Sequence, residues 1–309
     1  MTYMVLPSCN SGRSALKFAM WVVLHFLLPH YRKPPLAQVV LLRKCHDLSL
    51  LALHQEMVRS GVDVAAISVD RLDPADIATL SRISSKDVVF LLGTDLPSSR
   101  LPELVGYVNC RYFFNARPFR CEKIGDKRYQ QEAVAKVAPQ YAIETHSIGS
   151  VDGAKLQFPV LVKPPDGTCG RGVRLLENAE DFRRSRQSSL IVQPFIRNDG
   201  DWRVVVIDGK AVSAIKRVGR IGQVTNNIAT GSYAIEERDP AVLERVFEVA
   251  EAAAAALEFD YVGIDVIRDL DDGGFYFLEA NERATFETSQ LLTGINIAEI
   301  LSRSILARM

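Results

Sequence analysis

The chain has 309 residues, of which 48% are hydrophobic, which is enough to fill the cores of two or three compact domains. Lys plus Arg and Asp plus Glu both number 37, so no net charge recruits nucleic acid or an anionic membrane. The five cysteines lack CxxC spacing, and their odd number argues against a fully paired disulfide framework. We therefore expect a cytoplasmic globular protein without a nucleic-acid or membrane partner.

An apolar stretch at 15–29 dominates the first predicted segment, residues 1–36. It superficially resembles a signal peptide, but it is too short to span a bilayer, and the sequence PHYRK follows where small residues would precede cleavage. We expect instead a helix that packs on the body or on a second copy of the chain. This predicts a homo-oligomer, with membrane association as the alternative.

Strand-like and helix-like patterns alternate over 37–115 and predict a small α/β domain. Strands are expected at 37–42, 62–69 and 87–93, with helices at 48–59 and 74–83. No GxGxxG motif follows the first strand, so a dinucleotide site has no support there. NARP at 115–118 marks an expected boundary, after which Asp126 is positioned to cap a helix that carries Lys127 in its first turn.

A glycine-rich loop lies in the next predicted domain, residues 116–190. The strand FPVLVKP ends near Lys163, and the loop DGTCGRG follows it with three glycines. Glycines let backbone N–H groups approach phosphate oxygens, while the adjacent lysine adds a point charge. The spacing is not that of the P-loop, which requires GKS or GKT before a helix, so an ordinary hairpin turn is the alternative.

The last predicted domain, residues 191–309, opens with the strand LIVQPFI, which breaks at Pro194. Such a break exposes backbone groups that can bind an adenine ring between apolar side chains, whereas an edge strand ending at proline is the alternative. Two further strands flank Asp208-Gly209, a strong hairpin signal. Cations on such strands usually face solvent, but we expect one or two to face a nucleotide or a carboxylate. The charged residues on these strands are Asp201, Arg203, Lys216 and Arg217.

Two apolar runs at 262–267 and 275–280 flank the sequence DDGG and predict a β-hairpin. Side chains alternate along a strand, so Glu279 and Asn281 share a face, and an antiparallel neighbour can bring Asp265 beside them. Two carboxylates and an amide oxygen suit Mg²⁺, although a solvated charged face is the alternative. The carboxylates lie within apolar runs, where unpaired charge is costly, and we therefore favour a metal site.

Taken in order, these motifs resemble the ATP-grasp superfamily, and within it the RimK-like carboxylate–amine ligases, which include glutamate ligases acting on a ribosomal protein's C-terminus. The resemblance covers roughly residues 110–305. It is carried by Lys127, the VKP strand with its GTCGRG loop, QPFI, DWR, KR, NN, GID and LEAN. It implies an α/β (α+β) ATP-grasp fold, in which the small preceding α/β domain is followed by two α+β subdomains that grip ATP.

The resemblance also implies a role for each matched residue. The nucleotide contacts would be Lys127, Lys163, Gly167, Thr168, Gly170 and Gly172, with Gln193, Pro194, Phe195 and Ile196 at the adenine and Asp201 at the ribose. The catalytic residues around the phosphates would be Arg203, Arg217 and Asn227, and the ligands of Mg²⁺, for which Mn²⁺ can substitute, would be Asp265, Glu279 and Asn281. The implied reaction forms an acyl phosphate and ADP from a carboxylate and ATP, and an amine then displaces phosphate.

Two departures from the family pattern affect the substrate pocket. Thr225 and Thr230 stand where arginines are typical, and the metal strand continues NERAT instead of Asn-x-Ser-Pro-Gly. Arg220 or Arg283 are candidates to replace the missing cations. The alternatives are a graspetide-type peptide macrocyclase that forms side-chain amides or esters, and a nucleotide-binding protein without ligase turnover. The expected substrate is an amino acid or a peptide, free or on a carrier or precursor, and its identity stays open.

Overall fold

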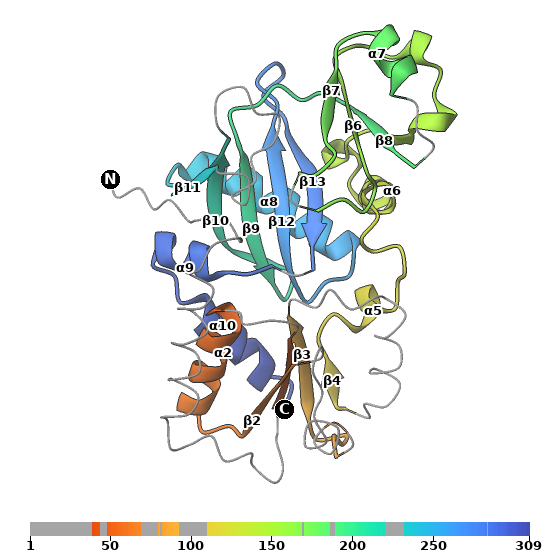
Figure 1. Cartoon of the computed structure of the whole chain (residues 1–309). Coiled ribbons are helices and arrows are strands. Elements are labelled where there is room, and N and C mark those ends of the chain that lie inside the picture. The colour runs from red at the N-terminus through yellow and green to blue at the C-terminus, as the bar shows by residue number, and fades with distance from the viewer. Residues whose placement is uncertain are drawn as a thin grey trace, which may run out of the picture. The chain divides into compact units, whose positions relative to one another are not determined.

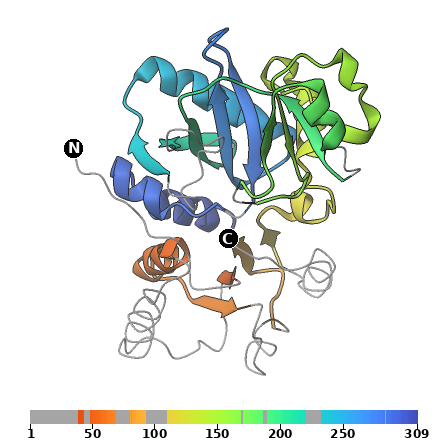
Figure 2. The same cartoon turned by 45° about the horizontal axis from the view of Figure 1, so that its top comes forward.

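The computed structural model describes residues 39–43, 48–68, 80, 82–92, 110–168, 170–185, 189–219, 232–282 and 284–309. These residues form two compact units, which are drawn in Figures 1 and 2. The parallel-sheet unit contains the described parts of 9–122, 259–261 and 282–309. The two-sheet unit contains the described parts of 123–258 and 262–281.

The parallel-sheet unit is built on a sheet with the strand order β2-β1-β3-β4. Its strands are β1 (Val39–Arg43), β2 (Val64–Ser68), β3 (Val88–Leu92) and β4 (Tyr112–Phe113), and each pairs in parallel with its neighbour. Helix α2 (Leu48–Arg59) connects β1 to β2. The βαβ opening that the sequence predicts is therefore confirmed.

Residues 284–309 complete this same unit. They form α9 (Glu287–Thr293) and α10 (Ile297–Leu306), and α10 packs against α2. The hydroxyl of Ser49 on α2 accepts hydrogen bonds from the backbone N–H groups of Phe286 (2.8 Å) and Glu287 (3.2 Å) at the start of α9. This segment falls within the predicted domain 191–309, because an amphipathic pattern shows that a helix buries one face without showing what it packs against.

Asn115 joins two distant segments of the parallel-sheet unit. It adopts a left-handed conformation (φ 59°) before the short helix α5 (Ala116–Phe119). Its side-chain oxygen accepts hydrogen bonds from the N–H groups of Asp260 (2.9 Å) and Tyr261 (3.0 Å), and its Nδ2 donates to the Tyr261 carbonyl (2.7 Å). Asn115 of the sequence NARP is therefore a buried junction inside the unit, although residues that form turns are also typical of a domain boundary.

The larger sheet of the two-sheet unit has the strand order β11-β10-β9-β12-β13. The strands are β9 (Asp201–Ile207), β10 (Lys210–Val218), β11 (Tyr233–Glu236), β12 (Tyr261–Arg268) and β13 (Phe275–Asn281). Helix α8 (Pro240–Ala256) covers one face of this sheet (Figures 1 and 2). Asp208 (φ 53°) and Gly209 (φ 72°) form the turn between β9 and β10, as the sequence predicts.

The smaller sheet has the strand order β5-β8-β6-β7 and is antiparallel throughout. Its strands are β5 (His146–Ser147), β6 (Val160–Lys163), β7 (Arg174–Leu176) and β8 (Ile191–Pro194). Helix α7 (Ala179–Arg184) lies beside β7, and Phe182 from this helix is buried with Val160, Val162 and Val192. The predicted strands at 158–164 and 190–196 are thus present but shorter.

Helix α6 (Lys127–Val137) is fixed to β13 by buried amides. The Asp126 side chain accepts hydrogen bonds from two N–H groups of the first turn, which confirms the predicted N-cap. Gln130 bonds both backbone groups of Ala280, donating to the carbonyl (3.0 Å) and accepting from the N–H (2.9 Å). Gln131 donates to the carbonyl of Phe277 (2.8 Å). These contacts satisfy the outer edge of β13 with side chains of α6.

Several predictions fall outside the described residues: the apolar stretch 15–29, most of the helix at 74–83, and most of the polar loop expected at 225–232, which contains Asn227. Of the cysteines, Cys110 and Cys121 lie in the described ranges, and both are free thiols. None of the described helices combines the length and the apolar content that a membrane-spanning segment needs.

Replacing Asn115 with Gly should destabilise the parallel-sheet unit. Glycine tolerates the positive φ angle, but the backbone groups of buried Tyr261 and half-buried Asp260 lose their partners, which should cost at least about 2 kcal/mol of unfolding free energy. Urea denaturation measures this loss. Asp208→Gly makes the same change at a positive φ angle in an exposed turn and should cost less than half as much. Equal losses of unfolding free energy in both variants would show that the side-chain hydrogen bonds of Asn115 do not stabilise the unit.

Candidate active site

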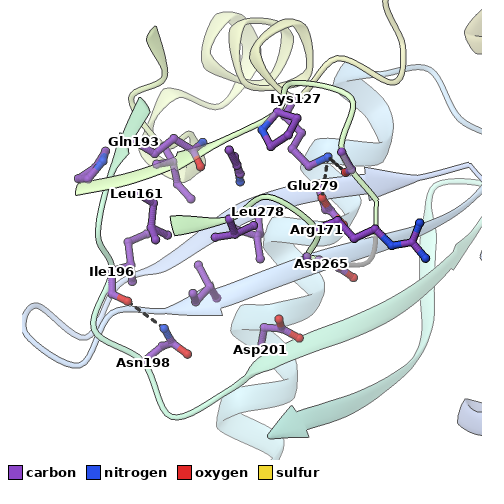
Figure 3. A pocket seen from close by; sticks show the side chains of 18 of the residues that line it. Lys127, Leu161, Arg171, Gln193, Ile196, Asn198, Asp201, Asp265, Leu278 and Glu279 are labelled. Carbon is purple, nitrogen blue, oxygen red and sulfur yellow. Dashed lines mark hydrogen bonds and ion pairs between the residues drawn. The ribbon is translucent and has the colours of Figure 1, made fainter. Parts of the chain in front are cut away.

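A cleft in the two-sheet unit lies between the two sheets and is bounded by α6 and the glycine loop (Figure 3). It contains about 870 Å³ of space, part of which is open solvent. The lining residues are Lys127, Ile143, Leu161, Lys163, Pro164, Gly167, Gly170, Arg171, Val173, Gln193, Pro194, Ile196, Asn198, Asp201, Arg217, Asp265, Ile267, Leu278 and Glu279.

The two ends of the cleft differ in chemistry. Figure 3 shows Leu161, Gln193 and Ile196 at one end, and Lys127 with Glu279 at the other. The first end is mainly apolar, and Gln193 there donates to the Thr145 hydroxyl (2.7 Å). The second end holds most of the charged side chains. A ligand with one flat apolar part and one highly charged part matches this division.

Strands β12 and β13 bring the predicted metal ligands together. Asp265 lies opposite Glu279 in the antiparallel register, and Asn281 lies opposite Gly263. Nδ2 of Asn281 is 3.3 Å from Oδ2 of Asp265 and 3.5 Å from Oε1 of Glu279. The expected convergence of these three side chains is therefore confirmed, while their role in metal binding stays a prediction.

A β-bulge on β13 adds an apolar residue to the same wall. The register passes from the Asp265–Glu279 pair directly to the Val266–Phe277 pair, so Leu278 is left without an opposite residue. A bulge allows two consecutive side chains to face one side of a sheet. Leu278 and Glu279 accordingly both line the cleft. Strict alternation of side chains could not have predicted this position for Leu278.

Asp265 is the centre of a buried ion network. It is 2% exposed and binds Arg203 through both carboxylate oxygens, with Nη2 of Arg203 at 3.1 Å from Oδ2. Its Oδ2 also lies 2.8 Å from Nη2 of Arg217, whose Nε donates to Asp201 (2.6 Å). Burial raises the pKa of Asp265, but attraction to Arg203 and Arg217 outweighs it and lowers the pKa to about 2. Asp265 is therefore ionised throughout the physiological pH range.

The two predicted lysines also lie at the charged end. Nζ of Lys127 donates to the Gly167 carbonyl (2.5 Å) and lies 3.3 Å from Oε2 of Glu279. Lys163 is 7% exposed, and its burial lowers its pKa to about 8, against the opposing attraction of Glu279. Lys163 is still mostly protonated at neutral pH. Both lysines thus carry positive charge beside the carboxylate of Glu279.

The glycine loop makes a tight turn against Pro164. Gly172 has a φ angle of 76°, and a Cβ atom there would lie 3.0 Å from Pro164. A Cβ atom on Gly167 would lie 3.2 Å from Pro164 and 3.3 Å from the Arg171 carbonyl. Glycine is therefore required for close packing at these positions. The role of this loop in phosphate binding stays a prediction.

Most of the predicted site residues meet in this cleft, and some do not. Lining it are Lys127, Lys163, Gly167, Gly170, Gln193, Pro194, Ile196, Asp201, Arg217, Asp265 and Glu279. Thr168, Gly172, Phe195, Arg203 and Asn281 are not among the lining residues, although Arg203 and Asn281 contact Asp265. Asn227, Thr225, Thr230, Arg220 and Arg283 lie outside the described residues. The lining residues that sequence reasoning missed are Ile143, Leu161, Pro164, Arg171, Val173, Asn198, Ile267 and Leu278.

Two of the lining residues that sequence reasoning missed could have been found from their spacing along a strand. Leu161 lies two positions before Lys163 on β6, and Ile267 lies two positions after Asp265 on β12. Residues two apart share a face of a strand, so each charged residue of the site marks an apolar neighbour on the same wall. Ile143 and Asn198 lie outside the strands, and no comparable spacing identifies them.

The donor set around Asp265 fits a hard divalent cation. Carboxylate and amide oxygens are the ligands that Mg²⁺ prefers, and a site with one or two protein carboxylates is typical for it. Asn281 here points Nδ2 at both carboxylates, so rotation of its amide would present Oδ1 to an ion. The described residues contain no cluster of three or more His, Cys, Asp or Glu side chains with metal-site geometry. The fit therefore depends on the amide of Asn281 as the third donor.

Comparison with known proteins decides the family. A profile of the RimK-like ATP-grasp domain matches residues 121–305, which is more than half of the chain. The chain belongs to the RimK-like ATP-grasp family. It is 33% identical over 155 residues to a probable alpha-L-glutamate ligase of Parasynechococcus marenigrum (strain WH8102), a match that covers 48% of this chain and 32% of that protein. The chain thus spans about a third of that relative's length.

Solved structures with low sequence identity share the fold. The ATP-grasp ligase PsnB complexed with a minimal precursor superimposes with a TM-score of 0.64 and 17% identity, covering 88% of this chain and 100% of that one. A D-alanine–D-alanine ligase from Bacillus anthracis complexed with ATP gives a TM-score of 0.60 and 16% identity, covering 88% of this chain and 97% of that one. This member of the RimK-like ATP-grasp family therefore has the ATP-grasp fold that the resemblance implies.

Replacing Asp265 with Ala should destabilise the two-sheet unit strongly. Buried Arg217 and partly buried Arg203 would keep their charges without this shared partner, and breaking a buried pair in this way costs about 3–5 kcal/mol. Urea unfolding followed by the fluorescence of Trp202, in a Trp21→Phe background, measures the loss.

Asp271→Ala is the matched control for this change, because Asp271 lies in the turn of the same hairpin and pairs with Arg197 at the surface, where both side chains are more than half exposed. The loss of unfolding free energy in Asp271→Ala should stay below about 1 kcal/mol. A similar loss in both variants would contradict the central role of Asp265 in the ion network.

Proposed function

We propose that this chain is an ATP-dependent, ADP-forming ligase that joins a carboxylate to an amine. The observation that carries the proposal is the cleft of the two-sheet unit, in which an apolar end adjoins lysine, arginine and paired carboxylate side chains. Family membership supports the same conclusion. The relative from Parasynechococcus marenigrum is named a probable ligase, and the Bacillus anthracis ligase of the same fold is complexed with ATP.

The geometry supports binding of ATP along the length of the cleft. Leu161, Ile196 and Leu278 offer apolar contacts for the adenine ring, and Asp201 also lines the cleft. Asp201 already binds Arg217, so a bond to the ribose would share this carboxylate. The terminal phosphates would then lie near Lys127 and Lys163. This orientation puts the negative end of the nucleotide beside the positive side chains.

The proposed reaction has two steps. An oxygen of the substrate carboxylate attacks the γ-phosphorus of ATP, the bond to the β–γ bridging oxygen breaks, and ADP leaves. The amine then attacks the acyl carbon of the acyl phosphate, inorganic phosphate leaves with the bonding electrons, and the nitrogen loses a proton. In both steps the protein positions the reactants and stabilises negative charge, and no side chain needs to act as a nucleophile.

Arg203 and Arg217 are suited to the catalytic role because their guanidinium groups are fixed in advance. Each is held by Asp265, so neither has to be ordered when the phosphoryl group is transferred. Asp265, Glu279 and Asn281 would hold Mg²⁺, or Mn²⁺ in its place, and the ion would neutralise phosphate charge. A second PsnB structure is complexed with its minimal precursor, Mg and ADP. Asn227 remains a proposed third catalytic residue.

The proposed substrate is an amino acid or a peptide. The similar protein named above is a probable alpha-L-glutamate ligase, which favours an α-amino acid as one partner. PsnB is complexed with a precursor, which favours a peptide and makes a peptide-modifying ligase the second candidate. We further propose that the protein acts in the cytoplasm as a homo-oligomer, which size-exclusion chromatography with light scattering would test.

A product screen tests the ligase proposal. The purified full chain is incubated with ATP and Mg²⁺ against single amino acids, dipeptides and candidate peptides, and ADP release is followed by identification of products by mass. A ligase gives ADP release that requires both a carboxylate and an amine, together with a product lighter than the sum of its substrates by one water. ATP binding without such a product across the screen would favour the nucleotide-binding alternative.

Glu279→Gln should nearly abolish phosphoryl transfer, because the amide keeps the shape of the side chain but loses the charge proposed to hold the metal ion. Asn281→Asp keeps an oxygen donor and should retain more activity. The initial rate of ADP release as a function of Mg²⁺ concentration measures both effects. A Glu279→Gln protein with the wild-type rate and the wild-type Mg²⁺ dependence would contradict the metal assignment.

Lys163→Met should weaken ATP binding without lowering the unfolding free energy. The lowered pKa of Lys163 shows that burial disfavours its charge, so an apolar side chain of similar length should leave the unfolding free energy equal or higher. The same change removes a cation from the charged end and should weaken ATP binding at least about tenfold. Isothermal titration with ATP and urea denaturation measure the two effects. Unchanged ATP affinity would remove Lys163 from the proposed nucleotide contacts.

A further inference from the structure

Arg171 is a lining residue of the cleft that neither the sequence motifs nor the family comparison assigns. It lies in the glycine loop between β6 and β7, and its side chain is exposed. Its backbone N–H donates to the Thr168 carbonyl (3.2 Å), so the loop turn sets where the side chain begins. In Figure 3 the guanidinium of this side chain points away from Asp265 and Glu279.

Other cations at this end of the cleft are already engaged. Lys127 contacts Glu279 and the Gly167 carbonyl, Arg203 binds Asp265, and Arg217 bridges Asp201 and Asp265. Lys163 is buried, and its charge is partly balanced by Glu279. Among the described residues, no side-chain hydrogen bond or ion pair is found for the Arg171 guanidinium. Arg171 therefore has its full hydrogen-bonding capacity available for a ligand.

The charge balance of the cleft indicates what Arg171 would bind. Lys127, Lys163, Arg203 and Arg217 are balanced by Asp201, Asp265 and Glu279 to within one positive charge, and the proposed Mg²⁺ would raise this excess to three. The terminal phosphates of a nucleoside triphosphate carry several negative charges. An additional cation at the charged end would improve the balance, and a guanidinium can bind two phosphate oxygens at once.

The backbone on both sides of Arg171 is adaptable. Gly170 and Gly172 flank it with φ angles of 69° and 76°, in a region where glycine is free of the strain that other residues experience. Rotation of the long Arg171 side chain and small changes at these two glycines can turn the guanidinium toward the cleft. Arg203 and Arg217, which are both held by Asp265, do not have this freedom.

We propose that Arg171 binds the terminal phosphate of the nucleotide and makes the cleft selective for a triphosphate over a diphosphate. This inference rests on the proposed function, because it assumes that ATP occupies the cleft with its phosphates at the charged end. Arg171 would add the cation that the paired residues of the network do not supply. It would also favour release of ADP after transfer, because the diphosphate lacks the group that Arg171 holds.

The test uses three variants of the full chain: Arg171→Gln, Arg171→Lys and Arg174→Gln. Arg174 is a matched control, since it is exposed on the adjacent strand β7 and lies outside the cleft lining. Isothermal titration with Mg²⁺ and either a non-hydrolysable ATP analogue or ADP measures the affinities. Arg171→Gln should weaken analogue binding about tenfold and ADP binding less than threefold. The affinity of Arg171→Lys for the analogue should lie between those of the wild type and Arg171→Gln. The affinity of Arg174→Gln should stay within twofold of the wild-type value.

Several outcomes would overturn the inference. Equal effects of Arg171→Gln and Arg174→Gln would show a general surface charge effect, and equal weakening of analogue and ADP would remove the terminal phosphate as the partner. Unchanged nucleotide affinities with a higher KM for the carboxylate substrate would assign Arg171 to that substrate instead. If the wild-type chain binds no ATP analogue, both this inference and the proposed function fail. If the wild type binds it and Arg171→Gln binds equally well, only this inference fails.

Discussion

The carboxylate of Asp265, shared between two guanidinium groups, is the interaction on which the two-sheet unit depends. It connects three neighbouring strands, since Arg203 lies on β9, Arg217 on β10 and Asp265 on β12. Buried charges are tolerated only when they are paired, so these side chains must adopt one arrangement for the sheet to form. The same pairing fixes Arg217, which lines the cleft, and Arg203 beside it. A requirement of folding thus also prepares the site for an anionic ligand.

The sheet side and the loop side of the cleft differ in how firmly they are held. The larger sheet is covered by α8 on one face, and its strand β13 is hydrogen-bonded through its backbone to α6. The loop that carries Arg171 has few such contacts, and glycines set its shape. The site therefore has two complementary parts, which are the fixed charges on the sheet and the adaptable glycine loop. The first can orient a ligand, and the second can adjust to its size and charge.

Local signals in the sequence predicted the features that depend on neighbouring residues. Asp126 caps α6 and Asp208-Gly209 forms a turn, because capping and turn formation involve only a few consecutive residues. The sharing of one face by Glu279 and Asn281 was also predictable, since side chains alternate along a strand, but the pairing of Glu279 with Asp265 needs the bulge, because the register set by the turn would place Leu278 opposite Asp265. The ion pairs of Asp265 with Arg203 and Arg217 were not, because they join positions about 50 to 60 residues apart that no local pattern relates. The bulge at Leu278 and the partner of α10 belong to the same class, being set by tertiary packing.

The way the parallel-sheet unit is assembled from distant segments has a consequence for synthesis of the chain. Its sheet begins at Val39, but the apolar residues of α10, including Leu301 and Ile305, are buried in the same unit. The two-sheet unit needs nothing beyond residue 281 and can close first as the chain leaves the ribosome. Strands β1 to β4 must wait, with their apolar surface incompletely covered, until residues 284–309 emerge. During that interval a nascent chain would be a natural client for a chaperone.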